Sequence, residues 1–198
     1  GLGVSKGDVV GTLAWNTNRH LESWYGITGL GAIYHTLNPR LFVEQLDYII
    51  NHAENKFIIS DISFVEILEN IHDKIPNVQG FIFLCEKSDL PKSNLKNVYS
   101  YEELVNSQDD NFEWVKLEED DACGLCYTSG TTGNPKGVLY SHRSNVLHTL
   151  VANSADAMGI KSTDVVMPVV PMFHANAWGL SFSAPMSGCK VVMPGMNM

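Results

Sequence analysis

The sequence has few cysteines, few basic residues and no glycosylation signal. Its 198 residues include four cysteines and no Asn-x-Ser/Thr sequon, which argues against a disulfide-rich secreted scaffold and predicts a cytoplasmic protein. Lys and Arg number 13 against 22 Asp and Glu, giving a net charge of −9. Because binding to nucleic acid needs clustered basic residues, we expect no nucleic-acid partner.

Motifs of several enzyme classes are also missing. There is no G-x-x-x-x-G-K-[ST], no G-x-G-x-x-G opening a helix, no G-x-S-x-G and no H-E-x-x-H. These absences argue against a P-loop NTPase, a dinucleotide-binding unit, a serine hydrolase and a zincin. A lone C-x-x-C, Cys123 to Cys126, has no second pair to complete a zinc site, and positions i and i+3 of a strand face opposite sides. We interpret these two cysteines as packing residues.

One long segment lacks charge but does not resemble a membrane span. Residues 165–189 contain no Asp, Glu, Lys or Arg, yet they carry three prolines, a histidine and an asparagine. A lipid-facing helix rarely carries so many helix breakers and polar groups, so we expect a buried strand, loop and helix instead.

The sequence also begins with Gly1 rather than Met and shows no signal peptide. We therefore expect a piece of a longer protein.

What the sequence does contain is the alternation of strands and helices of an α/β protein. Short, continuous apolar runs indicate strands buried on both faces, which predicts a mostly parallel sheet flanked by helices. The expected strands are residues 9–14, 57–59, 81–84, 122–127 and 138–140. The expected helices are residues 20–31, a helix capped by Asn38 with Pro39 in its first turn, residues 63–73 behind a capping box at Ser63, and a short helix capped by Ser100.

Acidic residues concentrate in one segment. Residues 101–121 hold nine acids and one lysine, so 1 − 9 = −8, which is nearly the whole net charge. A docking surface for a basic partner and a solvated linker both fit this composition. We favour the linker, because runs of like charge are usually solvated.

A loop dense in glycine and hydroxyl groups joins two of the expected strands. Residues 127–138 read Y-T-S-G-T-T-G-N-P-K-G-V. Glycines let the backbone approach a ligand closely, successive N–H groups can form an anion nest, and Lys136 adds a full positive charge. The loop offers these hydrogen-bond donors but no acidic side chain to accept from them, which suggests that it binds a polyphosphate. The alternative is a surface turn rich in small residues.

This loop resembles the phosphate-binding loop of the adenylate-forming superfamily, which includes acyl-CoA synthetases, adenylation domains and luciferases. The P-M-F-H-A-N-A-W-G stretch at residues 171–179 resembles a second core motif of that superfamily, and K-G-D-V-V at residues 6–10 resembles an early strand. The resemblance covers nearly the whole chain and is greatest for the medium- and long-chain fatty acyl-CoA synthetase branch. It implies that the chain is part of the large N-terminal domain of such an enzyme.

The resemblance implies a reaction and the residues that perform it. A carboxylate attacks the α-phosphate of ATP to give acyl-adenylate and pyrophosphate, and coenzyme A then displaces AMP. By resemblance, His174 lies against the acyl carboxylate as the catalytic residue, Trp178 gates the acyl tunnel, and Thr131 also supports Mg²⁺. Ala175 and Asn176 belong to the same acyl site. The residues that would grip the β- and γ-phosphates are Thr128, Ser129, Gly130, Thr131, Thr132, Gly133 and Lys136.

The resemblance also implies parts that the sequence lacks. The superfamily has a Y-G-x-T-E stretch, a ribose-binding Asp and a mobile C-terminal domain with a catalytic Lys, none of which occurs here. We therefore divide the chain into an α/β lobe (1–121) and a phosphate-loop and acyl-site segment (122–198), and expect no activity from it alone. Its apolar C-terminal part should promote homo-oligomers. A non-catalytic nucleotide- or pyrophosphate-binding module, and a fragment of an aryl- or amino-acid-adenylating enzyme, remain alternatives.

Overall fold

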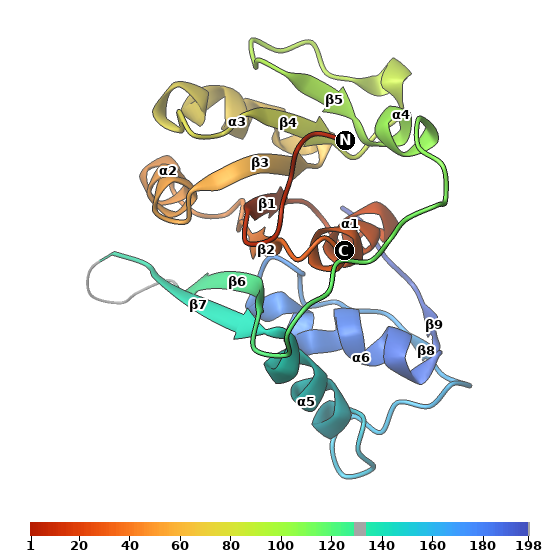
Figure 1. The fold of residues 1–198 in the computed structure, drawn as a ribbon. Helices are drawn as coiled ribbons and strands as arrows, with labels where there is room; N and C mark the ends of the chain where they lie inside the picture. Colours follow the sequence, from red (N-terminus) through yellow and green to blue (C-terminus); the bar gives the residue numbers. More distant parts are fainter. Residues whose placement is uncertain (129–133, 198) are drawn as a thin grey trace.

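A twisted, seven-stranded sheet forms the centre of the molecule (Figure 1). The computed structural model describes residues 1–128 and 134–197. The strand order is β5-β4-β3-β1-β2-β6-β7, and every neighbouring pair is parallel except β6 and β7. The strands are β1 (Val9–Leu13), β2 (Ile33–Thr36), β3 (Asn55–Ser60), β4 (Gly80–Phe83), β5 (Val98–Ser100), β6 (Ala122–Thr128) and β7 (Lys136–Ser141), with a separate parallel pair of β8 (Val165–Val166) and β9 (Lys190–Val191). The helices are α1 (Asn18–Gly29), α2 (Val43–His52), α3 (Val65–Ile71), α4 (Tyr101–Asn106), α5 (His142–Ala152) and α6 (Leu180–Ser187).

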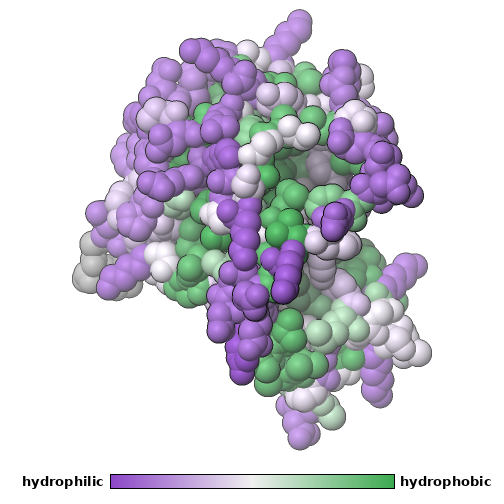
Figure 2. All heavy atoms as spheres, in the orientation of Figure 1, coloured by the Kyte–Doolittle hydropathy of each residue, from purple (hydrophilic) through white to green (hydrophobic). Residues whose placement is uncertain are grey.

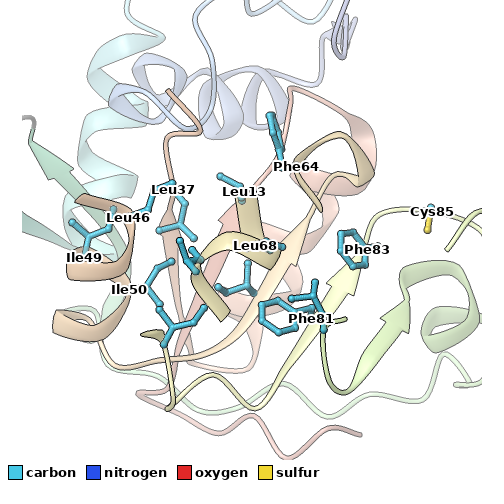
Figure 3. Close-up of a cluster of buried hydrophobic side chains, with 14 residues drawn as sticks. Leu13, Leu37, Leu46, Ile49, Ile50, Phe64, Leu68, Phe81, Phe83 and Cys85 are labelled. Carbon is cyan, nitrogen blue, oxygen red and sulfur yellow. The ribbon is translucent and has the colours of Figure 1, made fainter. Parts of the chain in front are cut away.

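Helices cover both faces of the sheet, so the predicted α/β class is confirmed. On one face α2 and α3 pack onto β1, β3 and β4 through an aliphatic and aromatic cluster that includes Leu46, Ile50 and Phe81 (Figure 3). On the other face α1 brings Trp24 onto Tyr34 of β2, with ring centroids 4.1 Å apart. Met172 and Ala177, from a segment far along the chain, complete this second cluster.

Most predicted strands are confirmed, but two predicted helix starts are wrong, the first of them at Asn38. Residues 38–41 form a turn, in which Asn38 Oδ1 accepts a hydrogen bond from the Arg40 backbone N–H. The helix α2 begins only at Val43, and the Gln45 side chain bonds back to the Phe42 N–H. An Asn-Pro pair favours a turn as well as a helix cap, and here the turn wins.

The predicted capping box at Ser63 is also wrong. Asp61 is the capping residue: its Oδ1 accepts bonds from the N–H and the hydroxyl of Ser63, and opens a 3₁₀ turn. The following helix, α3, starts at Val65. In contrast Ser100 does cap α4, because its hydroxyl accepts the Glu103 N–H at 3.2 Å.

The acidic segment, residues 101–121, forms α4 and then runs along the surface to β6. Two acids near its end make ion pairs, Asp121 with Lys6 and Glu119 with Arg143, each at 2.6 Å. The Lys6 ammonium holds the pKa of Asp121 below its ordinary value.

The C-terminal third is more exposed than expected. The strand, loop and helix predicted for residues 165–189 are present, but Val165, Val169 and Trp178 are about three-fifths exposed, so this stretch is not wholly interior. The strand β7 is likewise an exposed edge rather than a buried strand, and α5 carries four half-exposed or more exposed aliphatic residues. Hydrophobic side chains gather in the middle and lower part of the face in Figure 2, where Figure 1 draws α1, α5 and α6.

Within residues 1–128 and 134–197, no helix has both the length and the apolarity that crossing a bilayer would need.

Candidate active site

The glycine-rich loop connects the antiparallel strands β6 and β7. Thr128 and Lys136 are cross-strand partners, and the Thr128 hydroxyl donates to the Lys136 carbonyl oxygen at 3.4 Å. This pair closes the base of the loop, so Lys136 emerges beside the first loop residue. The other predicted phosphate-binding residues, Ser129 to Gly133, lie outside the described residues.

The residue before the loop base is held by α2. The Tyr127 hydroxyl and Nδ1 of His52 are 2.6 Å apart, and the rings of Tyr127 and His35 are 5.0 Å apart. Burial raises the pKa of Tyr127, so its hydroxyl stays protonated at neutral pH. An open cavity of about 800 Å³ separates α2 from Asn134 and Pro135. Its wall also contains Glu44 and Asp47, and carboxylates disfavour a phosphate there, so we assign no nucleotide to it.

The acyl-site motif turns its residues in opposite directions. His174, Ala175 and Trp178 are exposed, with Trp178 at 60%. Asn176 is buried: its Oδ1 accepts a bond from the Thr36 hydroxyl at 3.3 Å. Three of the four predicted acyl-site residues therefore face outward, and the fourth ties the motif to β2.

The phosphate-loop base and the acyl-site motif meet at the same end of neighbouring strands. Thr36, which bonds Asn176, is also the register partner of Cys126 in β6, two residues before Thr128. Carboxyl ends of parallel strands are where ligands of open α/β sheets bind. The structure therefore places the two motifs, Thr128–Lys136 and His174–Trp178, at the same end of neighbouring strands, although their residues are 38 to 50 positions apart in the sequence.

Cys123 has the properties of a packing residue. The four cysteines are free thiols. Burial raises the pKa of Cys123 to about 11, so it is not an activated thiolate, and its sulfur accepts a bond from Asn145 Nδ2 at 3.1 Å.

The described side chains form no cluster of metal-binding residues. Residues 1–128 and 134–197 contain no group of three or more His, Cys, Asp or Glu residues that could hold a metal ion. Thr131, the residue expected to support Mg²⁺, lies outside these ranges.

Two residues with polar contacts to the acyl-site motif were not assigned a role from the sequence. Asn16 follows β1 and Thr36 ends β2, so both precede the motif by well over a hundred residues. An isolated Asn or Thr after an apolar strand carries no motif. The same is true of His52, because a helix of ordinary amphipathic pattern gives no sign that its last residue contacts Tyr127.

Comparisons with known proteins identify the family of the chain. The family model described as "AMP-binding enzyme" matches residues 1–197, so the chain belongs to the AMP-binding enzyme family. It is 46% identical to the medium-chain-fatty-acid–CoA ligase of Ectopseudomonas oleovorans, over 98% of this chain and 36% of that protein. It is 47% identical to the 3-methylmercaptopropionyl-CoA ligase of Ruegeria lacuscaerulensis, over 100% of this chain and 36% of that protein.

A solved structure has the same fold. The anthranilate CoA ligase AuaEII, crystallised with anthranoyl-AMP, superposes with a TM-score of 0.85 at 26% identity, over 98% of this chain and 36% of that one. The chain thus spans about a third of the length of the relatives that it matches. The family and fold expected from the loop and its companion motifs are confirmed.

Proposed function

We propose that the chain is the ATP-gripping part of an AMP-forming acid–CoA ligase that activates a fatty acid or a related aliphatic carboxylate. The observation that carries this proposal is the meeting of the phosphate-loop base and the acyl-site motif at one end of the sheet. The two relatives named above are ligases of aliphatic acids, which favours such an acid over an aryl or amino acid.

The reaction has two displacements. A carboxylate oxygen of the acid bonds to the α-phosphorus of ATP and pyrophosphate leaves, giving acyl-AMP. The thiolate sulfur of coenzyme A then bonds to the acyl carbon, and AMP leaves with its electron pair, giving the thioester.

The residues of this chain would act by holding the reactants in line. Thr128, Ser129, Gly130, Thr131, Thr132, Gly133 and Lys136 are proposed to bind the β- and γ-phosphates. Lys136 would offset charge on the triphosphate, which lowers the cost of bringing in an anionic nucleophile. His174 would contact the carboxylate, and exposed Trp178 beside Ala175 would border the acyl chain. Asn176, whose side chain turns inward, would hold this motif on β2.

Three further properties are proposed on narrower grounds. Mg²⁺ would accompany ATP, with Thr131 beside it, because a bound triphosphate normally carries that ion. A cytoplasmic location is supported by four free thiols and by substrates made inside cells. Self-association is supported by the exposed edge strand β7 and the aliphatic face of α5.

Purified full-length protein tests the proposal. With ATP, coenzyme A and Mg²⁺, we expect AMP and pyrophosphate release that depends on an aliphatic acid, across a series from 3-methylmercaptopropionate to long-chain acids. Residues 1–198 alone should give no carboxylate-dependent ATP–pyrophosphate exchange. Turnover with benzoates or amino acids only would show that the substrate is an aryl or amino acid rather than an aliphatic acid. Nucleotide binding without any carboxylate-dependent turnover would favour a non-catalytic module.

A further inference from the structure

Asn16 ties the start of the acyl-site segment to the end of β1. Its side chain is wholly buried, and Nδ2 donates to the carbonyl oxygens of Pro168 at 2.9 Å and Val170 at 3.0 Å. Its Oδ1 accepts the Met172 N–H at 2.7 Å. The side-chain amide of Asn16 thus makes all three of these hydrogen bonds with backbone groups that lie more than 150 residues later in the sequence.

The neighbours of Asn16 fix its own position. Trp24 Nε1 donates to Nε2 of His20 at 3.0 Å, so the ring proton lies on Nδ1 and points to the Trp15 carbonyl oxygen, also 3.0 Å away. Thr17 caps α1 by accepting the His20 N–H at 3.2 Å. The residues on either side of Asn16 are therefore both hydrogen-bonded to the first turns of α1.

The segment held by Asn16 continues into a left-handed turn. Four consecutive non-glycine residues, Ala175 to Trp178, have φ between 47° and 56°, and Gly179 follows at 76°. A left-handed conformation costs an L-residue about 1–2 kcal/mol, so such a run persists only where surrounding contacts determine it. Two of those contacts are visible: Thr36 bonds Asn176 at 3.3 Å, and Ala177 is wholly buried.

This turn is what separates the outward-facing residues from the buried ones. His174 lies just before it and Trp178 within it; both are exposed, while Asn176 and Ala177 between them are buried. A right-handed path through the same residues would turn different side chains outward. The anchors on either side of His174 thus set the direction of the two side chains proposed to meet the acyl group.

We propose that Asn16 and Thr36 are positioning residues for the acyl site: they hold residues 168–176 on the ends of β1 and β2, and so place His174 and Trp178. Neither residue touches substrate in this scheme. The inference rests on the proposed function, because it concerns how the acid-binding side of that site is built.

A positioning role differs measurably from a role in stability alone. Loss of stability lowers the amount of active enzyme, which changes the apparent kcat but leaves each KM unchanged. Loss of position changes the parameters for the acid selectively, because Thr128 and Lys136 are carried by β6 and β7 and have no hydrogen bond to Asn16 or Thr36 among the described residues.

The test compares three variants of the full-length protein by initial rates of pyrophosphate release. Asn16→Ala removes the first anchor; Thr36→Val keeps the side-chain shape but removes the hydroxyl that bonds Asn176. Asn55→Ala is the control, because Asn55 is equally buried but its amide, with the nitrogen toward His35, bonds His35, Ile50 and Gly11 instead. Folded fractions are matched by circular dichroism before kinetics.

We expect Asn16→Ala to lower kcat/KM for the acid about 10- to 100-fold, since displacements near 1 Å cost that much, with KM for ATP within about twofold of wild type. Thr36→Val should lose about 3- to 10-fold, the range for one hydrogen bond. Both should also change the preference between a short and a long acid, because Trp178 moves. Asn55→Ala should keep the acid KM and the preference of wild type.

Several results would overturn the inference. Wild-type kcat/KM for the acid in folded Asn16→Ala would do so, as would equal losses for the acid and ATP, or the same pattern in Asn55→Ala. If Asn16→Ala does not fold, Thr36→Val decides, and a wild-type acid profile in that variant refutes the proposal. A wild-type protein with no carboxylate-dependent turnover would overturn the proposed function, and this inference with it.

Discussion

Two buried histidines should make the stability of this chain depend steeply on pH between 7 and 5. His20 and His35 are both fully buried, and that burial lowers the pKa of each from 6.5 to about 4. The unfolded chain binds both protons once the pH falls below about 6.5, whereas the folded chain takes them up only near 4. Protonation between these values therefore favours the unfolded state.

The size of the effect follows from the two pKa values. At pH 5 each histidine costs about 2 kcal/mol relative to pH 7, so the pair costs about 4 kcal/mol, a large part of the stability of a domain this size. His142, whose pKa burial also lowers, acts in the same direction. The carboxyl of Asp8 adds little here, because its pKa lies below 3.8 in the folded chain and the loss begins only at lower pH.

Urea unfolding followed by far-UV circular dichroism at the two pH values measures this loss. A His35→Gln variant removes one of the two groups, so its loss of unfolding free energy between pH 7 and 5 should be about half that of wild type. A wild-type loss below about 1 kcal/mol, or an unchanged pH dependence in the variant, would refute the assignment of neutral, buried imidazoles.

Three further predictions address the loop, the left-handed turn and the exposed surface. Lys136→Ala should weaken ATP binding by roughly 1.5–3 kcal/mol, the value of a hydrogen bond to a charged group, measured by calorimetry on the full-length protein; unchanged affinity would count against the loop assignment. Gly179→Ala should destabilise the fold by about 1–3 kcal/mol, because φ is 76° and the added carbon would lie 2.6 Å from the His148 ring. Gly26→Ala, in α1 with open space around it, is the matched control, and should be neutral or slightly stabilising in the same thermal scan. Residues 1–198 should self-associate in light scattering through β7 and α5, and a strictly monomeric species at high concentration would contradict this.

The parts of the fold that local sequence determines were predictable. Continuous apolar runs such as Phe57–Ile59 and Phe81–Phe83 lie in strands as expected, because a strand buried on both faces places every residue of such a run away from water. The strand before the phosphate motif, β6, was predicted for the same reason, whereas β7 is present as predicted but lies at an exposed edge. Helix starts were less predictable. Asn38 and Ser63 have side chains that cap turns as readily as helices, and the choice depends on neighbours such as Gln45 and Asp61.

Exposure in the C-terminal third could not be predicted from apolar composition. An uncharged segment predicts burial, yet Val165, Val169 and Trp178 are exposed and α5 shows apolar residues all along its outer face. Composition indicates how much apolar surface would be stabilised by burial. It does not indicate whether another part of this chain packs against that surface. The same pattern is therefore consistent with a core in one chain and with a self-association surface in another.

The anchor Asn16 escaped prediction for a more general reason. A motif such as P-M-F-H-A-N-A-W is recognisable because its side chains form a pattern, but Asn16 binds two carbonyl oxygens and an N–H, which are backbone groups common to almost every residue type. A side chain that contacts only backbone leaves no complementary pattern at its partner positions. This contact matters because the left-handed turn that follows contains four strained residues, which keep one conformation only where surrounding contacts hold them. The orientation of the acyl site thus depends on β1 and β2, and changes there should alter substrate preference without touching the motif itself.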